Sequence, residues 1–556
     1  MHASLTKLIP AAFAPLVPRS ARPSAMTLAA AAASASTKGG AATATLLPDR
    51  VDYLVVGGGA TGMAFCDTLL RHAPSPVSVA VIDSHARPGG QWNDSYDFVR
   101  LHQPSDMYGV ESTRLEPAPA ASTGDDDEAR GEAHRATREE ILDYYSGVCG
   151  TLEEEYDFRF VGETSFDVSQ LDLVDDDEAS AKDDEGAVAE DDRHRRYALS
   201  GGRSILARKV VDGRYLEPDL PVHVPPKFGF DPNAIDCVPV NSMTEREKKH
   251  HVIIGAGKTG MDAITFLLTQ RNADPDDILW IVPNEAWITA RENIGSCMEF
   301  LRDCATGLAE DGRLNEEGRR DATRSSDFFQ RGFLQWEKQG RIYRFDEDIL
   351  PTKFKDATLS KGELELIKKV KRVVRNGRVK SIDDDGTLRF SDGTTVSLPW
   401  SSAAVPDTLF VHCSAGAFNY SKQTKKPPPV FSRCRISIQD VYGTPGFCFV
   451  GSVIGRLESL DGKLSDEEKN SMCLAPAPDE GRARLELGPS GGDVGAISGD
   501  HGLVQRLHNL REWLRVPEIR GWLVGHRLFN LRHRGAEDID ALVEETWNAL
   551  QQFDIV

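Results

Sequence analysis

Two glycine-rich stretches carry the residue types and the spacing that bind a pyrophosphate. In the first, Gly57, Gly59 and Gly62 follow the apolar run 53–56 in the pattern Gly-x-Gly-x-x-Gly. The first glycine of such a pattern allows a sharp turn, the second lets backbone N–H groups approach the phosphates, and the third lets a helix pack against the strand. The N-terminus of that helix would hold the phosphates through its free N–H groups and its dipole.

An acidic residue completes this first unit. Pro74 and Pro76 end the helix that follows the glycines, and the apolar stretch 77–82 predicts a second buried strand. Asp83 comes directly after that strand, where it could accept hydrogen bonds from a ribose diol. A glycine pattern alone is weak evidence, but strand, turn, helix, second strand and terminal acid together predict a complete βαβ dinucleotide-binding unit.

A second unit of the same kind follows later in the chain. The apolar run 251–254 leads into a glycine pattern, a predicted helix at 261–268 and a predicted strand at 278–282. Its candidate phosphate-binding residues are Gly255, Gly257, Lys258, Thr259 and Gly260. The Gly-Lys-Thr sequence also resembles part of a P-loop, but that motif requires glycine where Val252 stands.

The second unit lacks the acidic residue that ends the second strand of the first. Pro283 and Asn284 stand there instead. An acid at this point would repel a 2′-phosphate, so its absence favours NADP(H) over NAD(H), and Arg291 could hold the phosphate. The nearby Glu285 weakens this preference for NADP(H). The alternative for Arg291 is an ion pair at the surface.

Length and charge limit the classes of partner. The chain has 556 residues, with 86 acidic and 65 basic side chains and a formal net charge of −21. Such a length allows two or more domains. The negative charge argues against nucleic acid and anionic membranes as general partners. No uncharged apolar run approaches the roughly 20 residues that span a bilayer, so we expect a soluble protein without a transmembrane segment.

The nine cysteines form no recognisable framework. None stand as Cys-x-x-Cys, and no spacing matches a set of zinc ligands. We therefore expect no metal site, no dithiol redox relay, and thiols that are buried or free in a reducing compartment.

The N-terminal segment 1–49 differs in composition from the rest of the chain. It is rich in Ala, Ser, Thr and Pro, and Asp49 is its first acidic residue. This composition is typical of a transit peptide for a mitochondrion or a plastid. The alternative is a disordered tail on a cytoplasmic protein, with Met26 as a second start. We exclude this segment from the fold.

Other segments show the elements that must support the two units. Thr137 and Glu140 have the spacing of a capping box and predict the start of a helix. The acidic run 175–192 is predicted to be a solvated insertion. Within the polar stretch 290–375, helical patterns include 364–374.

The C-terminal half adds a small β-structure and two helices. Segment 379–398 alternates short apolar runs with Asp-Gly turns and predicts a β-meander. Segments 503–514 and 541–550 have the apolar spacing of amphipathic helices.

A glycine pair after the first unit points to a known family. The residues concerned are Gly89, Gly90, Gln91 and Trp92. Together with Asp83, this Gly-Gly-x-Trp element resembles that of the flavin-containing monooxygenase type of flavoprotein, in which both features contact FAD. The resemblance implies FAD in the first site, held by Asp83 and 89–92. We add His102 and Gln103 as candidates near the flavin. The alternatives are a core aromatic for Trp92 and ordinary loop polar residues for the other two.

The resemblance also implies a fold. It is an α/β fold with two Rossmann-type dinucleotide-binding domains, in which the NAD(P)-binding domain is inserted into the FAD-binding domain. The expected divisions are a tail at 1–49, the first part of the FAD-binding domain at 50–245, the NAD(P)-binding domain at 246–405, and the returning part of the FAD-binding domain with C-terminal helices at 406–556. We expect the strand 408–412 and the segment 447–451 to belong to this return.

The implied activity is that of an oxidoreductase that uses FAD and NADP(H). NADPH would pass a hydride to the flavin, which would then react with oxygen or another acceptor. Monooxygenation of a small organic molecule is the first hypothesis. The family element F-x-G-x-x-x-H-x-x-x-W/Y is absent from 237–251, so a flavin-dependent reductase or dehydrogenase stays open. A sensor or scaffold that binds FAD and NADP without catalysis also stays open. No catalytic residue is assigned.

Overall fold

The computed structural model describes ten stretches of the chain. They are residues 47–115, 133–167, 169–171, 194–214, 217–309, 327–415, 428–443, 446–475, 498–533 and 539–551. All described residues belong to one compact part of the chain, Leu47–Val556. The predicted tail, apart from residues 47–49, and the acidic insertion at 175–192 lie outside the described residues.

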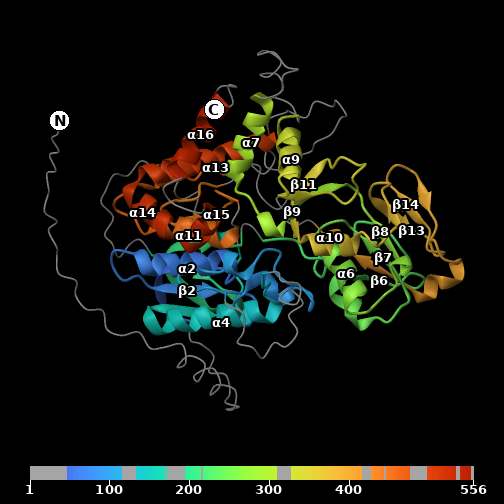
Figure 1. Ribbon diagram of the computed structural model, residues 1–556. Helices are drawn as coiled ribbons and strands as arrows, with labels where there is room; N and C mark the ends of the chain where they lie inside the picture. The colour runs from blue at the N-terminus through green and yellow to red at the C-terminus, as the bar shows by residue number, and fades with distance from the viewer. Residues whose placement is uncertain are drawn as a thin grey trace, which may run out of the picture. The chain divides into compact units, whose positions relative to one another are not determined.

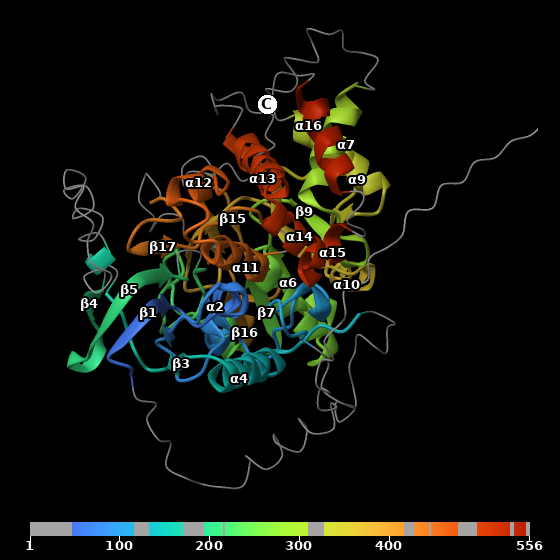
Figure 2. The ribbon, with the colours of Figure 1, turned by 90° about the vertical axis from the view of Figure 1, so that its left-hand side faces the viewer.

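A parallel sheet forms around the first glycine turn. Its order is β17 (Arg435–Ser437), β5 (Ser204–Asp212), β1 (Arg50–Val56), β2 (Val79–Ile82) and β3 (Phe158–Val161). These strands are all parallel, and β4 (Arg195–Ala198) pairs antiparallel with β5. Figure 2 shows β1, β5 and β4 side by side. The continuous apolar runs of β1 and β2 suit strands that are buried on both faces.

Three helices share a core with this sheet. They are α2 (Ala60–His72), α4 (Arg138–Glu155) and α11 (Phe447–Glu458), and α11 lies along α2 (Figure 1). A Cβ atom at Gly451 of α11 would lie 2.3 Å from the Thr61 carbonyl oxygen, so only glycine allows this approach. The predicted capping box of α4 is confirmed, because the Glu140 carboxylate accepts from the Thr137 N–H at 2.8 Å.

A second parallel sheet forms around the second glycine turn. Its order is β12 (Val373–Val374), β8 (Ile278–Ile281), β7 (His250–Ile254), β16 (Thr408–His412) and β6 (Cys237–Pro239). Each pair of neighbours is parallel. The predicted α/β fold with two Rossmann-type units is therefore confirmed by the strand order and by the helices packed on both sheets.

Different elements cover the two faces of the second sheet. On one face, α6 (Lys258–Thr269) and α10 (Lys361–Ile367) share a core with β7 and β8. On the other face lies the predicted β-meander, which forms as β13 (Val379–Ile382), β14 (Leu388–Phe390) and β15 (Thr395–Val396). The helix predicted at 364–374 is too long, because α10 ends at Ile367 and 373–374 join the sheet edge as β12.

Sheet membership differs from the expected path of the chain. The strand at 408–412 was expected to return to the first unit, but as β16 it pairs with β7 of the second. The second sheet also contains β6 at 237–239, so its strands begin before residue 246 and end after residue 405. The chain returns to the first sheet at β17, followed by α11. Local hydrophobicity marks a buried strand but does not select its partner.

The remaining elements form a small sheet and helices. The sheet has the order β10 (Ile342–Tyr343), β9 (Ala286–Ala290) and β11 (Lys353–Leu359). The helices are α7 (Cys297–Ala309), α9 (Asp327–Lys338), α12 (Asp466–Ser471), α13 (Ser498–Arg515), α14 (Pro517–Gly525), α15 (Arg527–His533) and α16 (Ile539–Gln551). The predicted helices 503–514 and 541–550 are confirmed within α13 and α16. None of the helices among the described residues is long and apolar enough to cross a membrane.

A buried ion network holds the first sheet to its covering helices. Glu458 of α11, which is 1% exposed, accepts from the Tyr53 hydroxyl and the Lys209 ammonium, both at 2.8 Å. Its other oxygen accepts from the Lys469 ammonium at 3.0 Å. One carboxylate therefore joins two buried lysines, Lys209 of β5 and Lys469 of α12, and Asp466, 2.7 Å from the Lys469 ammonium, supplies a second negative charge.

We expect Glu458→Gln to lower the free energy of unfolding by about 3 kcal/mol or more, because the buried Lys209 ammonium would lose its closest counter-charge. Equilibrium denaturation in urea measures this change. The control is Glu544→Gln, which removes the half-exposed partner of Arg511 and should cost less than about 1 kcal/mol. Equal losses in the two variants would contradict this account of the network.

Candidate functional site

The first glycine turn has the geometry that its sequence predicts. Gly57 has a φ of +103°, which an L side chain rarely adopts. A Cβ atom at Gly62 would lie 2.1 Å from the Gly57 carbonyl oxygen, so the helix can approach the strand only with glycine there. Gly59 is the N-cap of α2 and carries no side chain to occupy the first N–H groups of the helix. These N–H groups can therefore face a phosphate.

The Gly-Gly-Gln-Trp element sits directly on this turn. The Gly89 N–H donates to the Gly58 carbonyl oxygen at 2.8 Å. Gly90 has a φ of +54°, and a Cβ atom on it would lie 2.8 Å from the Gly59 Cα. The short 3₁₀ helix η1 (Gly90–Asp94) then begins. The backbone of 89–90 therefore packs directly against the first glycine turn.

The side chains of Gln91 and Trp92 have different surroundings. Trp92 is 8% exposed, and its indole N–H donates to the Tyr108 hydroxyl at 2.9 Å. Its side chain therefore belongs to the core, which was the alternative given for it. The side-chain amide oxygen of Gln91, Oε1, is buried and has no hydrogen-bond partner among the described residues. An unsatisfied buried acceptor next to the turn fits a site that a polar ligand completes.

Asp83 lies at the tip of β2 and is already engaged by the protein. Its Oδ2 accepts from the Gly58 N–H at 2.7 Å, and its Oδ1 accepts from the His85 N–H at 2.8 Å. The His85 ring nitrogen Nδ1 lies 2.7 Å from the same Oδ1. A carboxylate offers about four lone-pair positions, so about one remains for a ribose hydroxyl.

His85 continues a chain of charged groups away from Asp83. Its Nε2 lies 2.8 Å from Asp94 Oδ2, and the same oxygen lies 3.1 Å from the His223 ring. Burial alone would lower the pKa of His85, but its contacts with Asp94 and Asp83 outweigh burial and raise the pKa above the usual value. This series of charged groups links the first glycine turn to the proline-rich connector between the two sheets.

The second glycine turn repeats the geometry of the first. Gly255 has a φ of +128°, and a Cβ atom at Gly260 would lie 2.3 Å from the Gly255 carbonyl oxygen. Gly257 is the N-cap of α6, again without a capping side chain. Lys258 and Thr259 open this helix, and Lys258 is only 7% exposed. The turn is therefore built to place N–H groups, rather than the lysine ammonium, towards a phosphate.

Lys258 belongs to a contact between the two Rossmann-type units. It pairs with Asp262 on the next turn of α6, and the Tyr96 hydroxyl donates to the same carboxylate at 2.7 Å. Next to it, the Phe98 ring stacks on Phe266 of α6 with 4.3 Å between centroids. The segment that follows the Gly-Gly-Gln-Trp element therefore reaches the second helix.

Arg291 is neither at the surface nor available for a 2′-phosphate. It is 6% exposed and pairs with Glu363 at the start of α10, which also accepts from Arg135 Nη1 at 2.8 Å. The Arg291 Nε donates to the His102 carbonyl oxygen at 2.8 Å. The predicted ion pair of Arg291 is therefore present but buried rather than at the surface, because tertiary contacts set its guanidinium against a carboxylate. Arg291, Glu363 and Arg135, together with Lys258, are called the boundary cluster below.

The boundary cluster controls two nearby ionisable groups. Burial and the Lys258 charge lower the pKa of His102 to about 3, so its ring is neutral near pH 7. Burial would raise the pKa of Glu363, but Lys258, Arg135 and Arg291 overcome it and hold the value at about 2. His102 therefore lies beside the boundary cluster, and Gln103, the next residue, is partly buried.

The tip of β8 carries an ion pair that the sequence did not reveal. Glu285, 8% exposed, accepts from Arg375 Nε at 2.5 Å, and Arg375 follows the neighbouring strand β12. Arg375 also lies 3.5 Å from Asp346. Because β8 and β12 are distant in sequence, only the sheet order brings this arginine to the position where Arg291 had been expected.

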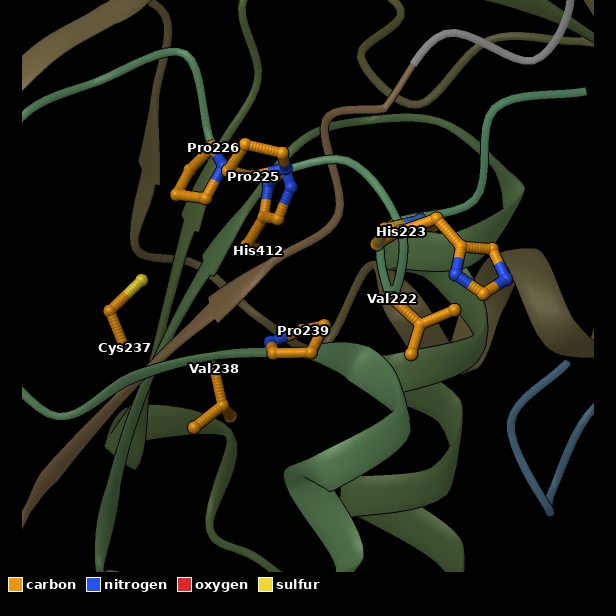
Figure 3. Close-up of a pocket in the computed structure, with 9 residues that line it drawn as sticks. Val222, His223, Pro225, Pro226, Cys237, Val238, Pro239 and His412 are labelled. Atoms are coloured by element: carbon orange, nitrogen blue, oxygen red, sulfur yellow. The ribbon is translucent and has the colours of Figure 1, made fainter. Parts of the chain in front are cut away.

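A cavity of about 260 Å³ opens at the carboxyl ends of β6 and β16 (Figure 3). Its lining includes Cys237, His223 and His412, with prolines of the connector above them. The His412 Nε2 lies 3.0 Å from the Val224 carbonyl oxygen and Nδ1 lies 3.1 Å from Ser414 Oγ. Cys413, the next residue, packs against Gly255, so the cavity adjoins the second glycine turn. Among the described residues, no group of ligand side chains could hold a metal ion.

The C-terminal helices support the first site through Arg527, which sequence reasoning missed. Its guanidinium donates to the carbonyl oxygens of Asp106, Tyr108, Val110 and Thr113, at 2.9, 2.7, 2.6 and 3.1 Å. This binds α15 to the loop that carries Tyr108, the partner of Trp92. No local pattern signals such a contact, because it joins segments far apart in the chain.

Two parallel sheets, each with a glycine turn between its first strand and helix, define a protein with two dinucleotide-binding folds. The family model for an NAD(P)-binding Rossmann-like domain matches residues 55–107, which include the first turn and the Gly-Gly-Gln-Trp element.

Curated relatives extend over most of the chain. Uncharacterized protein Rv2000 of Mycobacterium tuberculosis (strain ATCC 25618 / H37Rv) is 30% identical over 484 residues, which cover 86% of this chain and 77% of that protein. Uncharacterized protein Mb2023 of Mycobacterium bovis matches to the same extent. The chain belongs to the family of these mycobacterial proteins.

Solved structures that align with this chain are distant in sequence. Cyclohexanone monooxygenase from Rhodococcus sp. Phi1 bound to NADP+, a triple mutant, aligns with 13% identity and a TM-score of 0.43, over 75% of this chain and 86% of that chain. A flavin monooxygenase mutant from Stenotrophomonas maltophilia aligns with 14% identity and a TM-score of 0.40, over 74% and 98% of the two chains.

We expect Gly62→Ala to lower the free energy of unfolding by about 1–3 kcal/mol, because the new methyl group would meet the Gly57 carbonyl and force α2 away from β1. Thermal or urea denaturation measures the loss. Gly147→Ala is the matched control on α4, where a Cβ atom meets nothing within 4 Å. It should be neutral or stabilising by up to about 1 kcal/mol, and a similar loss in both variants would refute the packing argument.

The boundary cluster predicts a pH-dependent difference between wild type and Glu363→Gln. The folded-state pKa of Glu363, about 2, lies below its ordinary value of 4.5. The stability from this carboxylate is therefore full above about pH 4.5 and is lost as the pH falls towards 2. The difference in unfolding free energy between the two proteins should be largest near pH 6 and shrink below pH 4.5. Urea denaturation across that range tests this, and a constant difference would contradict it.

Proposed function

We propose that the protein is an oxidoreductase that holds FAD in the first glycine turn and NADPH in the second, and that its use is monooxygenation of a small organic molecule. The observation that carries this proposal is the Gly-Gly-Gln-Trp turn docked on the first glycine turn, through the 2.8 Å hydrogen bond from Gly89 to Gly58. The second turn lacks this addition, so the two sites suit different dinucleotides.

Residues of the first site fit a flavin dinucleotide. The N-terminus of α2 would bind the pyrophosphate, and the remaining lone pair of Asp83 would accept one ribose hydroxyl. The unsatisfied Oε1 of Gln91 would gain a donor from the ligand. Bound FAD would supply the redox chemistry, by taking up electrons from NADPH and passing them to oxygen or another acceptor.

Contacts between the two units support transfer from one site to the other. The Tyr96–Asp262 hydrogen bond and the stacking of Phe98 on Phe266 fix the segment after the first site against α6. The neutral ring of His102 lies between the sites, near Lys258. A neutral imidazole there adds no charge to the two cations of Lys258 and Arg291, and it can donate one hydrogen bond and accept another.

A reductase without oxygen activation is the second candidate. It is favoured by the absence of the family's F-x-G-x-x-x-H-x-x-x-W/Y element from 237–251. That region forms β6, the 3₁₀ helix η6 (Val240–Glu245) and β7, and its exposed residues are mainly charged. The two candidates share both cofactors and differ only in what accepts the electrons.

The choice of NADPH over NADH rests on the tip of β8. Arg375 would turn from Glu285 to a 2′-phosphate, which it could bind as a planar fork. The buried carboxylate of Glu285 limits this preference. The composition of residues 1–49 supports localisation to a mitochondrion or a plastid. Sequencing of the mature N-terminus from native cells would test this proposal.

The test is an absorbance spectrum of the purified protein, followed by anaerobic addition of NADPH or NADH. We expect flavin bands that bleach faster with NADPH than with NADH. Return of the bands on admission of oxygen, with product formed from an added substrate, favours the monooxygenase over the reductase. Flavin bands that no nicotinamide dinucleotide bleaches would leave a non-catalytic flavin binder and overturn the proposed activity.

Two variants assign the sites in the same experiment. Gly62→Ala should lose flavin absorbance, because its methyl group disrupts the first turn, whereas Gly260→Ala should keep the bands but bleach slowly with NADPH. The reverse pattern would exchange the two assignments. Gly147→Ala, remote from both turns, should behave as the wild type.

A further inference from the structure

The two units repeat one more feature, at the strand next to the first strand of each sheet. In the first sheet, Asp212 at the end of β5 lies in register with Val56 of β1, and Gly213 and Arg214 follow. In the second sheet, His412 at the end of β16 lies in register with Ile254 of β7, and Cys413 and Ser414 follow. Arg214 and Ser414 therefore hold equivalent positions.

Both loops pack on the first glycine of their turn. A Cβ atom at Gly57 would lie 2.8 Å from Cγ of Arg214, so the arginine side chain lies directly over that glycine. A Cβ atom at Gly255 would instead meet the Cys413 carbonyl oxygen at 2.7 Å. The first turn is thus covered by a cationic side chain, and the second by backbone.

The Arg214 guanidinium has donors that the protein does not use. Its Nε and Nη2 atoms are buried and make no hydrogen bond to any described residue. Its charged neighbour is Asp212, whose Oδ1 lies 3.9 Å from Nε and instead accepts the Arg214 backbone N–H at 3.1 Å. Asp212 also lies 3.9 Å from Nη2 of Arg435. Buried guanidinium donors without partners are costly unless a ligand completes them.

The topology gives the direction from which that ligand comes. In the first sheet, β2 and β3 lie on one side of β1, and β5 and β17 lie on the other. A dinucleotide in such a sheet binds at the carboxyl ends of the strands, in the crevice between β1 and β5. Arg214 stands at that crevice, over the turn that receives the pyrophosphate.

We propose that Arg214 is a pyrophosphate ligand of the dinucleotide in the first site, and that the corresponding Ser414 leaves the second site without this charge. This inference rests on the proposed function, because it takes FAD as the ligand of the first turn. An arginine can hold two phosphate oxygens at once through its planar fork, and it adds a full positive charge that the backbone N–H groups of α2 do not carry. The first site should therefore hold its dinucleotide more tightly than the second.

The test compares FAD binding by the wild type and Arg214→Ser, which gives the first site the residue of the second. Full-length protein is stripped of flavin, and FAD is titrated by fluorescence quenching. We expect the Kd to rise roughly 10- to 100-fold, with a weaker dependence on salt. Arg214→Lys, which keeps the charge without the fork, should fall between them. Arg196→Ser, an exposed residue of β4, is the matched control and should bind as the wild type.

Two further ligands locate the contact. ADP, which carries the diphosphate without the flavin, should lose as much affinity as FAD in Arg214→Ser, whereas NADP+ at the second site should lose none. Unchanged FAD binding in Arg214→Ser and Arg214→Lys would overturn the inference, as would a loss for FAD without one for ADP. A wild-type protein that binds no FAD would overturn the proposed function itself. This outcome is distinct from failure of the Arg214 inference, because it is measured on the wild type before any variant is compared.

Discussion

The close approach of each helix to the strand before it is the constraint on which the sites depend. At both turns the third glycine lies so near the carbonyl oxygen of the first that a methyl group would stand 2.1 Å or 2.3 Å from it. This approach aims the first N–H groups of α2 and α6 at one point at the edge of each sheet. Everything else around the sites, including Asp83 and the Gly-Gly-Gln-Trp turn, is arranged on that edge.

The first turn is more elaborate than the second. Gly58 alone receives the Asp83 carboxylate on its N–H and the Gly89 N–H on its carbonyl oxygen. Arg214 lies over Gly57, and α15 fastens the adjacent loop through Arg527. The second turn has different attachments: the Trp280 indole N–H donates to the Gly255 carbonyl oxygen at 2.9 Å, Cys413 packs on Gly255, and a cavity lies beside it. This difference between the two turns suits the proposal that the first site holds its cofactor tightly and the second exchanges its cofactor.

Charge is concentrated where the units meet. Glu363 bridges Arg291 and Arg135, and Lys258 and Asp262 pair beside them, so residues from distant segments neutralise one another in a buried place. Removing Glu363 would leave two buried guanidinium groups without the carboxylate that they share. The Glu458 network acts in the same way between the first sheet and α11. The two clusters therefore tie the sheets to their surroundings by contacts that hydrophobic packing alone would not specify.

The sequence by itself determined both glycine turns, their strands and helices, the capping box of α4 and the β-meander, because each depends on residues a few positions apart. It also predicted 89–92 as part of the first site, with the core as the alternative for Trp92, and the structure places the Trp92 side chain in the core. Only the tertiary structure decided the membership of β6 and β16 in the second sheet, the burial of Arg291 against Glu363, and the positions of Arg375, Arg527 and Arg214. These depend on pairings across long sequence separations, for which hydrophobicity and spacing carry no information about the partner.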